Sequence, residues 1–208
     1  GVNGFLWDDA DWGFQHIEQD RAQKVFRRNG YDPDITWRDD GESILLCMQK
    51  VGDASLRGAD VFAWADKTVR QLRKHSDRKI IIRPHPLYRK SALHNELKEN
   101  LLRISNVHWN EADVTKNSFQ PIDKVLKNTW CTVTYTSGTG IDAVLHGVPN
   151  IACNSGSMVF DVSSKNLEDV ENPYRGDKEI WTNKIAHCQW SIEEFESGEC
   201  WDHVSKSI

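Results

Sequence analysis

The segment from Thr132 to Pro149 constrains the fold more than any other, because it predicts a strand, a tight turn and a helix in succession. β-Branched residues give way to small ones, and apolar residues at helical spacing follow. Gly147 and Pro149 end the predicted helix. The turn would present backbone N–H groups and hydroxyls at a helix N-terminus, which is a typical phosphate site. A plain turn, in which Ser137 or Thr139 only caps the helix, is an equally good interpretation of this segment alone.

Short apolar runs alternate with helical segments along the rest of the chain. We expect strands at Ser43–Met48, Lys79–Ile82, Asn106–Trp109, Cys131–Tyr135 and Asn150–Cys153. We expect helices at Gln15–Arg28, Asp60–Lys74, Ser91–Arg103, Pro121–Lys127, Gly140–His146, Lys178–His187 and Ser191–Ser197. This alternation predicts βαβ units, and therefore an α/β fold with a Rossmann-like parallel sheet flanked by helices.

Polar and small residues follow three of the predicted strands at their carboxyl ends, where open α/β sheets bind their ligands. Three separate loops would therefore meet at one crevice, which favours a binding site over an ordinary turn. The residues of these loops, in chain order, are Gln49, Asp53, Ser55, Arg83, His85, Thr136, Ser137, Gly138 and Thr139.

The side chains at this crevice suit a nucleotide diphosphate or monophosphate that acts as the leaving group of a reaction. Arg83 can neutralise phosphate in a forked geometry. His85 can stabilise charge that grows on the leaving phosphate, or it can be a structural histidine held between two prolines. Asp142, in the first turn of its helix, can bind ribose hydroxyls or simply favour the helix dipole. The chain contains no Walker A, G-x-G-x-x-G, H-E-x-x-H or G-x-S-x-G pattern.

Composition narrows the classes of function. The net charge of −5 argues against a simple nucleic-acid binder. The five cysteines are scattered without a C-x-x-C pair, which indicates free thiols in a reducing cytoplasm. The mean hydropathy of −0.62 and the lack of a long apolar run predict no membrane span.

Two smaller features have both a functional and an ordinary interpretation. Asp8, Asp9 and Asp11 could supply a base or a metal site, although solvated loop acids are the favoured interpretation. Three arginines near Trp37 hint at a basic and aromatic surface, although a solvated face is favoured; they are Arg27, Arg28 and Arg38.

Three motifs together resemble the C-terminal, donor-binding half of GT-B glycosyltransferases. They are Q-K-V-G-D-A-S (49–55), R-P-H-P (83–86) and T-S-G-T-G-I-D-A-V-L-H-G-V-P (136–149). The chain is most similar to capsule-polysaccharide-type enzymes. Phage-encoded glycosyltransferases also look similar, including the opening N-G-F and the tail C-Q-W-x-x-x-x-x-x-S-G-E-x-W (188–201). The resemblance covers roughly residues 37–204.

The resemblance implies a metal-independent enzyme that needs no cofactor and uses a nucleotide-sugar as substrate. The acceptor would be a hydroxyl of a glycan or of a modified base in phage DNA. His85, Ser137 and Thr139 would contact the donor phosphate, and Asp142 would face the ribose. The remaining motif residues would line the cleft between the two halves of the enzyme, with Asp53 as the candidate base; they are Gln49, Asp53 and Ser55.

A complete GT-B enzyme also carries an acceptor-binding domain, for which the residues before Ser43 are too few. We expect an N-terminal segment (1–40) that links to or remains from a second domain, and a nucleotide-sugar-binding domain with C-terminal helices (41–208). Either a second domain outside this sequence or a homo-oligomer completes the enzyme, or the chain is a minimal variant. Its expected location is the cytoplasm, that of the host if the protein is viral. Two other functions stay open, a non-catalytic nucleotide-binding or partner-binding module and a CDP-linked phosphoalcohol transferase.

Overall fold

The computed structural model describes residues 20–32, 34, 36–85, 92–110 and 121–206. The chain divides into two compact units, one formed by residues 36–175 and the other by residues 1–35 together with 176–208. We call them the sheet unit and the terminal unit and describe each by itself. Asp8, Asp9 and Asp11 lie outside the described residues.

The sheet unit contains a five-stranded parallel sheet in the order β3-β2-β1-β4-β5. All five predicted strands are present, so the predicted α/β fold is confirmed. Every residue of β1 is buried, as expected for the centre of a parallel sheet covered on both faces. The strands are β1 (Ser43–Cys47), β2 (Lys79–Arg83), β3 (Val107–Trp109), β4 (Thr129–Thr134) and β5 (Asn150–Ala152).

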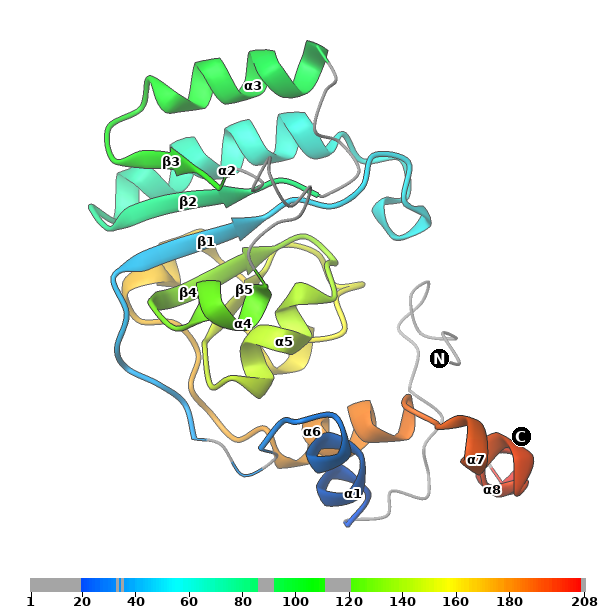
Figure 1. Cartoon of the computed structure of the whole chain (residues 1–208). Helices are drawn as coiled ribbons and strands as arrows, with labels where there is room; N and C mark the ends of the chain where they lie inside the picture. The colour runs from blue at the N-terminus through cyan, green and yellow to red at the C-terminus, as the bar shows by residue number, and fades with distance from the viewer. Residues whose placement is uncertain (1–19, 33, 35, 86–91, 111–120, 207–208) are drawn as a thin grey trace. The chain divides into compact units, whose positions relative to one another are not determined.

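Helices cover both faces of this sheet (Figure 1). One core joins Ile44 and Leu46 of β1 to α2 (Val61–His75) and α3 (Ala92–Leu102). The other core joins Leu45 and Cys47 to α4 and α5. The latter helices span Ile122–Leu126 and Thr139–Leu145. Successive residues of β1 thus point to opposite faces, as strand geometry requires.

The strand order creates a switch point between β1 and β4. From β1 the chain moves outward through β2 to β3, and it then returns to place β4 on the other side of β1. The loops after β1 and β4 therefore leave the same edge of the sheet in opposite directions. In open α/β sheets, ligands bind in the crevice at such a point.

The terminal unit consists of short helices from both ends of the described chain: α1 (Arg21–Arg28), α6 (Glu179–His187), α7 (Ile192–Glu196) and α8 (Glu199–Ser205). The buried Arg21 guanidinium joins three of these segments. It donates to the Ala186 and Gln189 carbonyls, pairs with Glu194 at 3.1 Å and lies 3.6 Å from the Trp190 ring centroid. The first three helices overlap predicted ones, whereas α8 was not predicted.

Short 3-10 helices complete the sheet unit, at Ala54–Leu56, Phe160–Val162 and Leu167–Glu171. The last of these packs against α2 and is joined to β4 by a hydrogen bond of 2.7 Å from the Trp130 indole to the Val170 carbonyl. Among the described helices, none combines the length and apolar character needed to cross a membrane.

Candidate functional site

A buried amide joins the loops after β1 and β4 at the switch point. Gln49 Oε1 accepts a 2.8 Å hydrogen bond from the Thr136 backbone N–H. Gln49 Nε2 lies 2.9 Å from the hydroxyl oxygens of both Ser55 and Thr136. Gln49 is 8% exposed and Thr136 is 4% exposed. The structure therefore brings the first and third predicted loops together and ties them to one another.

This network uses the polar groups that the sequence suggested for ligand contact. The Gln49 amide has protein partners for its oxygen and its nitrogen, and the two hydroxyls also lie 3.0 Å from each other. Buried polar groups that satisfy one another in this way hold a loop in one conformation. The geometry of Gln49 and Thr136 therefore supports a positioning role, whereas direct contact with a donor stays a prediction.

Asp53 and His85 lie near enough at this edge of the sheet for their charges to interact. Asp53 precedes the Ala54–Leu56 helix, and its carboxylate accepts from the Ser55 hydroxyl at 2.7 Å and from the Ser55 N–H at 2.9 Å. These bonds, with a smaller effect of His85, lower the pKa of Asp53 below its usual value. The carboxylate is exposed and ionised at neutral pH, and its low pKa makes it a weak base.

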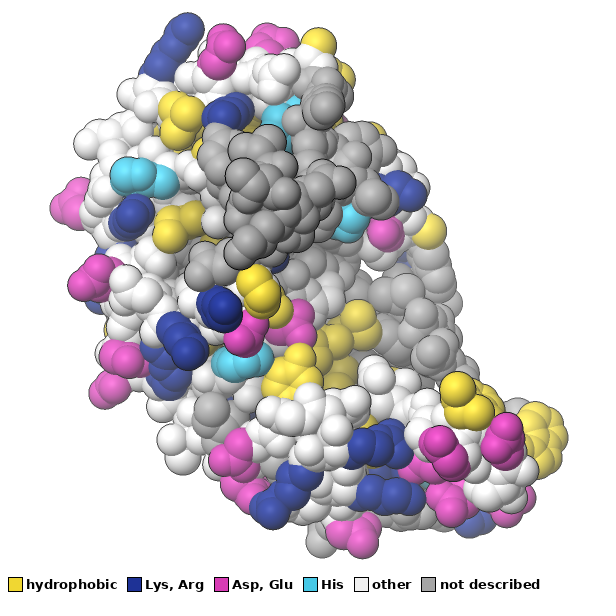
Figure 2. Space-filling view, in the orientation of Figure 1, with side chains coloured by type: hydrophobic (Ala, Val, Ile, Leu, Met, Phe, Trp, Pro, Cys, Tyr) yellow, Lys and Arg dark blue, Asp and Glu magenta, His cyan; other side chains and the backbone are white. Residues whose placement is uncertain are grey.

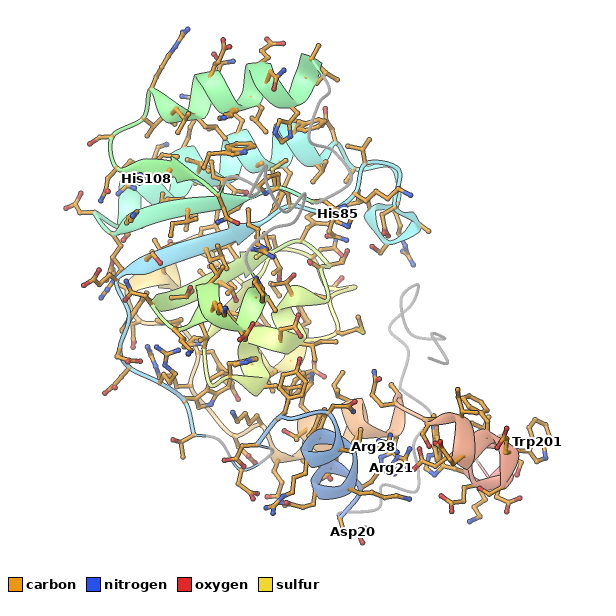
Figure 3. All side chains as sticks on the ribbon, viewed as in Figure 1. Asp20, Arg21, Arg28, His85, His108 and Trp201 are labelled. Atoms are coloured by element: carbon orange, nitrogen blue, oxygen red, sulfur yellow. The ribbon has the colours of Figure 1, made fainter. Side chains whose placement is uncertain are left out.

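His85 lies just beyond the carboxyl end of β2 (Figure 3). Partial burial lowers the pKa of its imidazole below 6.5, although the charge of Asp53 opposes this shift. The ring is therefore neutral at pH 7 and carries one N–H donor. A neutral histidine beside an ionised carboxylate is poised to take up a proton when a further negative charge approaches.

Arg83 supplies the positive charge at this edge. Its backbone carbonyl accepts from the Met48 N–H at 2.9 Å, and its side chain donates to Asn110 Oδ1 at 3.0 Å. Burial lowers the pKa of the guanidinium, and the negative charge of Asp142 acts in the opposite direction. An arginine remains charged even so. The charges of Arg83, at the end of β2, and Asp142, on α5, therefore act on each other.

The turn before α5 is open at one position and tightly packed at another. A Cβ atom added to the exposed Gly138 would meet no atom within 4 Å. A Cβ added to Gly140 would lie 2.7 Å from Val159 Cγ2. The Ser137 hydroxyl accepts from the Thr139 N–H at 3.3 Å. The backbone at Gly138 is therefore open to solvent, while Gly140 allows α5 to pack closely.

Asn110 was not identified from the sequence, although it follows a parallel strand, as the predicted site residues do. It follows β3 directly, and its N–H donates to the Ile82 carbonyl at 2.8 Å while its side chain accepts from Arg83. Lys50 was also missed; its charge acts on both Asp53 and His85. The same rule, a polar residue after a parallel strand, would have found Asn110.

The arginines near Trp37 have structural partners. Arg38 donates to the Leu126 and Lys127 carbonyls at 2.9 and 2.6 Å, and Arg27 pairs with Asp34 at 3.2 Å. On the face shown in Figure 2, basic and acidic side chains of the described residues are interspersed without a continuous basic surface. Within the described residues, no three His, Cys, Asp or Glu side chains gather in a metal-binding group.

The five cysteines carry unpaired thiols, and four of them are buried. Burial raises the pKa of Cys47 to about 12, and the nearby Arg83 lowers it only in part. Burial also raises the pKa of Cys153 to about 11. These thiols are therefore protonated at neutral pH and belong to the core rather than to the chemistry of the site.

Comparison with known protein families and with curated proteins gives no match to this chain. Among solved structures, KpsC from Thermosulfurimonas dismutans, a beta Kdo 2,4 transferase, is similar with a TM-score of 0.47 and 18% sequence identity. The match covers 86% of this chain and 56% of the KpsC chain. The chain therefore spans little more than half the length of this distant structural relative.

Proposed function

We propose that this chain is the donor-binding half of a GT-B-type glycosyltransferase, which moves a sugar from a nucleotide to a hydroxyl acceptor without a bound metal. The observation that carries the proposal is the junction of the β1 and β4 loops through Gln49 and Thr136 at the switch point of the sheet. Arg83 ends β2 and His85 follows it at the same edge. This is the place and the chemistry that a nucleotide diphosphate requires.

In this proposal, Arg83 and His85 act on the diphosphate. The guanidinium pairs with phosphate oxygens, while the neutral imidazole donates its N–H to the oxygen that gains charge as the sugar leaves. Growing charge strengthens that hydrogen bond, so the effect is larger in the transition state than in the bound donor. Burial lowers the pKa of His85, and an added phosphate charge would act in the opposite direction and favour the protonated ring.

Asp53 is the proposed base for the acceptor hydroxyl. A base with a depressed pKa removes a proton less effectively, and its two bonds to Ser55 hold the carboxylate in place. The alternative role for Asp53 is to favour the protonated form of His85. An Asp53→Asn variant separates these roles. If Asp53 is the base, kcat falls and the pH profile of donor binding is unchanged. If its charge supports protonated His85, the pH profile of donor binding shifts.

Titration calorimetry of the full chain with UDP, CDP, CMP and GDP tests the proposed site. His85→Ala should weaken binding of the preferred nucleotide about tenfold to a hundredfold, the range for a hydrogen bond to a charged group. The matched control is His108→Ala, since His108 is an exposed histidine on β3 (Figure 3). Gly138→Ala should also weaken binding, because its Cβ enters the open space above the turn.

Failure of all four nucleotides to bind would refute the enzyme proposal, and unchanged binding by His85→Ala would refute the site. Turnover then separates the open alternatives. Release of free sugar from a UDP- or CMP-linked donor supports glycosyl transfer, whereas cleavage of a CDP-linked alcohol supports phosphoalcohol transfer. Nucleotide binding without turnover, when both an acceptor-binding half and a glycan or DNA acceptor are supplied, supports the non-catalytic module. A second domain or another copy of the chain would provide the acceptor-binding half.

A further inference from the structure

A groove of about 470 Å³ runs along the outer flank of α2, opposite residues 165–168. The residues from α2 include Trp64, Lys67, Gln71 and Lys74, and the facing wall includes Lys165. None of these residues belongs to the candidate nucleotide site. The groove is therefore a separate surface of the sheet unit.

The groove is positively charged in a protein whose net charge is −5. Three lysines line it against one carboxylate, that of Glu168. Within the described part of the chain, Lys67, Lys74 and Lys165 form no ion pair. Lys165 Nζ donates to the Phe160 and Ser163 carbonyls, which fixes its ammonium group at the wall. The local excess of positive charge indicates an anionic ligand.

The spacing of the lysines along α2 suits an extended polymer rather than a small ion. Lys67 and Lys74 are two helical turns apart, a separation of about 10 Å along the axis. Trp64 lies at the end of the groove near the carboxyl edge of the sheet, because its ring meets that of Tyr135 edge-on with centroids 5.8 Å apart. Tyr135 directly precedes Thr136 of the candidate site. The groove therefore begins beside the proposed nucleotide and leads away from it.

The other lining groups favour a sugar chain as the anion. Gln71 and Asn166 carry amides that bond sugar hydroxyls, and Trp64 offers an aromatic ring. Single-stranded nucleic acid is bound by several stacking rings and by arginine. The lining contains two aromatic rings, those of Trp64 and His75, and no arginine. Its composition therefore fits an acidic glycan better than a nucleic acid.

We propose that this groove binds a carboxylate-bearing polysaccharide, the growing acceptor or product of the transferase. The choice of a glycan rests on the proposed function, whereas the preference for an anionic chain rests on the groove itself. Lys67 and Lys74 would pair with successive carboxylates, and Trp64 would direct the chain toward the nucleotide site.

Binding of a purified oligogalacturonate to the full chain, measured by calorimetry at low salt, tests this proposal. The fully methyl-esterified oligosaccharide is the uncharged control. Lys67→Gln with Lys74→Gln should weaken oligogalacturonate binding about fivefold to tenfold, the effect of two exposed ion pairs. The matched control is Lys124→Gln with Lys127→Gln, an equal change of charge at two exposed lysines of α4 and its C-terminus.

Selective loss with the groove variant, together with no binding of the esterified form, supports the proposal. Equal loss in both variants, no binding to wild type, or tighter binding of oligothymidylate or polyglutamate overturns it. The same preparations are titrated with UDP. UDP binding without oligogalacturonate binding refutes the groove alone, whereas the reverse result refutes the nucleotide site and leaves an acidic-glycan surface.

Discussion

Replacing Gln49 with leucine should destabilise the sheet unit by about 2–3 kcal/mol. The substitution leaves the Thr136 N–H, which donates to Gln49 at 2.8 Å, buried without a partner. An unsatisfied buried donor costs about 1–3 kcal/mol. The Ser55 and Thr136 hydroxyls lie 3.0 Å apart and can still bond each other. The loss of their hydrogen bonds to Gln49 therefore adds only about 0.5–1 kcal/mol.

Urea denaturation followed by circular dichroism measures this cost. Because the chain has two units, hydrogen exchange of peptides that cover β4 identifies the transition of the sheet unit. Gln71→Leu is the control, since this partly exposed glutamine on α2 makes no hydrogen bond within the described structure. It should change the free energy of unfolding by less than about 0.5 kcal/mol.

A double-mutant cycle with Thr136→Val isolates the side-chain part of the network. The valine keeps the backbone N–H and removes the hydroxyl, which lies 2.9 Å from Gln49 Nε2. A coupling of about 1 kcal/mol between the two substitutions is expected for residues in contact. A coupling near zero, or a cost for Gln49→Leu no larger than that of the control, would refute the claim that this amide holds the two loops together.

Three further changes test the packing and the charges. Gly140→Ala should cost about 1–3 kcal/mol in urea denaturation, because its Cβ lies 2.7 Å from Val159 Cγ2, and Val159→Ala should restore part of the loss. Gly41→Ala should cost about 3 kcal/mol or more, since φ is +112° and the Cβ would lie 2.6 Å from the Thr129 carbonyl carbon. Although burial opposes the shift, hydrogen bonds from Ser191, Arg21 and Lys24 lower the pKa of Glu194 from 4.5 to about 2. Its stabilisation of the terminal unit, about 2–3 kcal/mol, is complete above pH 4.5 and is lost as the pH falls toward 2, and Glu194→Gln should flatten this pH dependence in hydrogen exchange of α7.

The strands could be predicted because each is a short apolar run that ends at polar, glycine or proline residues. The β1 run is buried on both faces, which leaves no alternation to confuse with a helix. The order of the strands could not be predicted. Alternation of strands and helices sets the class, whereas the order depends on which face each helix covers, and that is decided by packing between residues far apart in sequence.

The terminal unit shows the same limit. The predicted helices from both ends of the chain are present, but periodicity gives no information that they group together through Arg21 and Glu194. The chain divides at residues 35–36 and 175–176, so the C-terminal helices group with the N-terminal segment. The domain boundary expected at residues 40–41 stays a prediction. α8 was missed because seven residues after Gly198 are too short for a clear apolar stripe.

The candidate site was predicted from the sequence, but the roles within it depend on geometry. Sequence places Gln49, Thr136, Asp53 and His85 at strand ends without saying whether a side chain faces a ligand or another side chain. In the structure, Gln49 and Thr136 are buried and face each other, whereas Asp53 is exposed and His85 is half-buried. Substitution of the first pair should therefore lower stability and nucleotide binding together. Substitution of His85 should lower nucleotide binding alone. This difference in effect distinguishes a binding site held in place by Gln49 and Thr136 from a set of polar residues that merely end their strands.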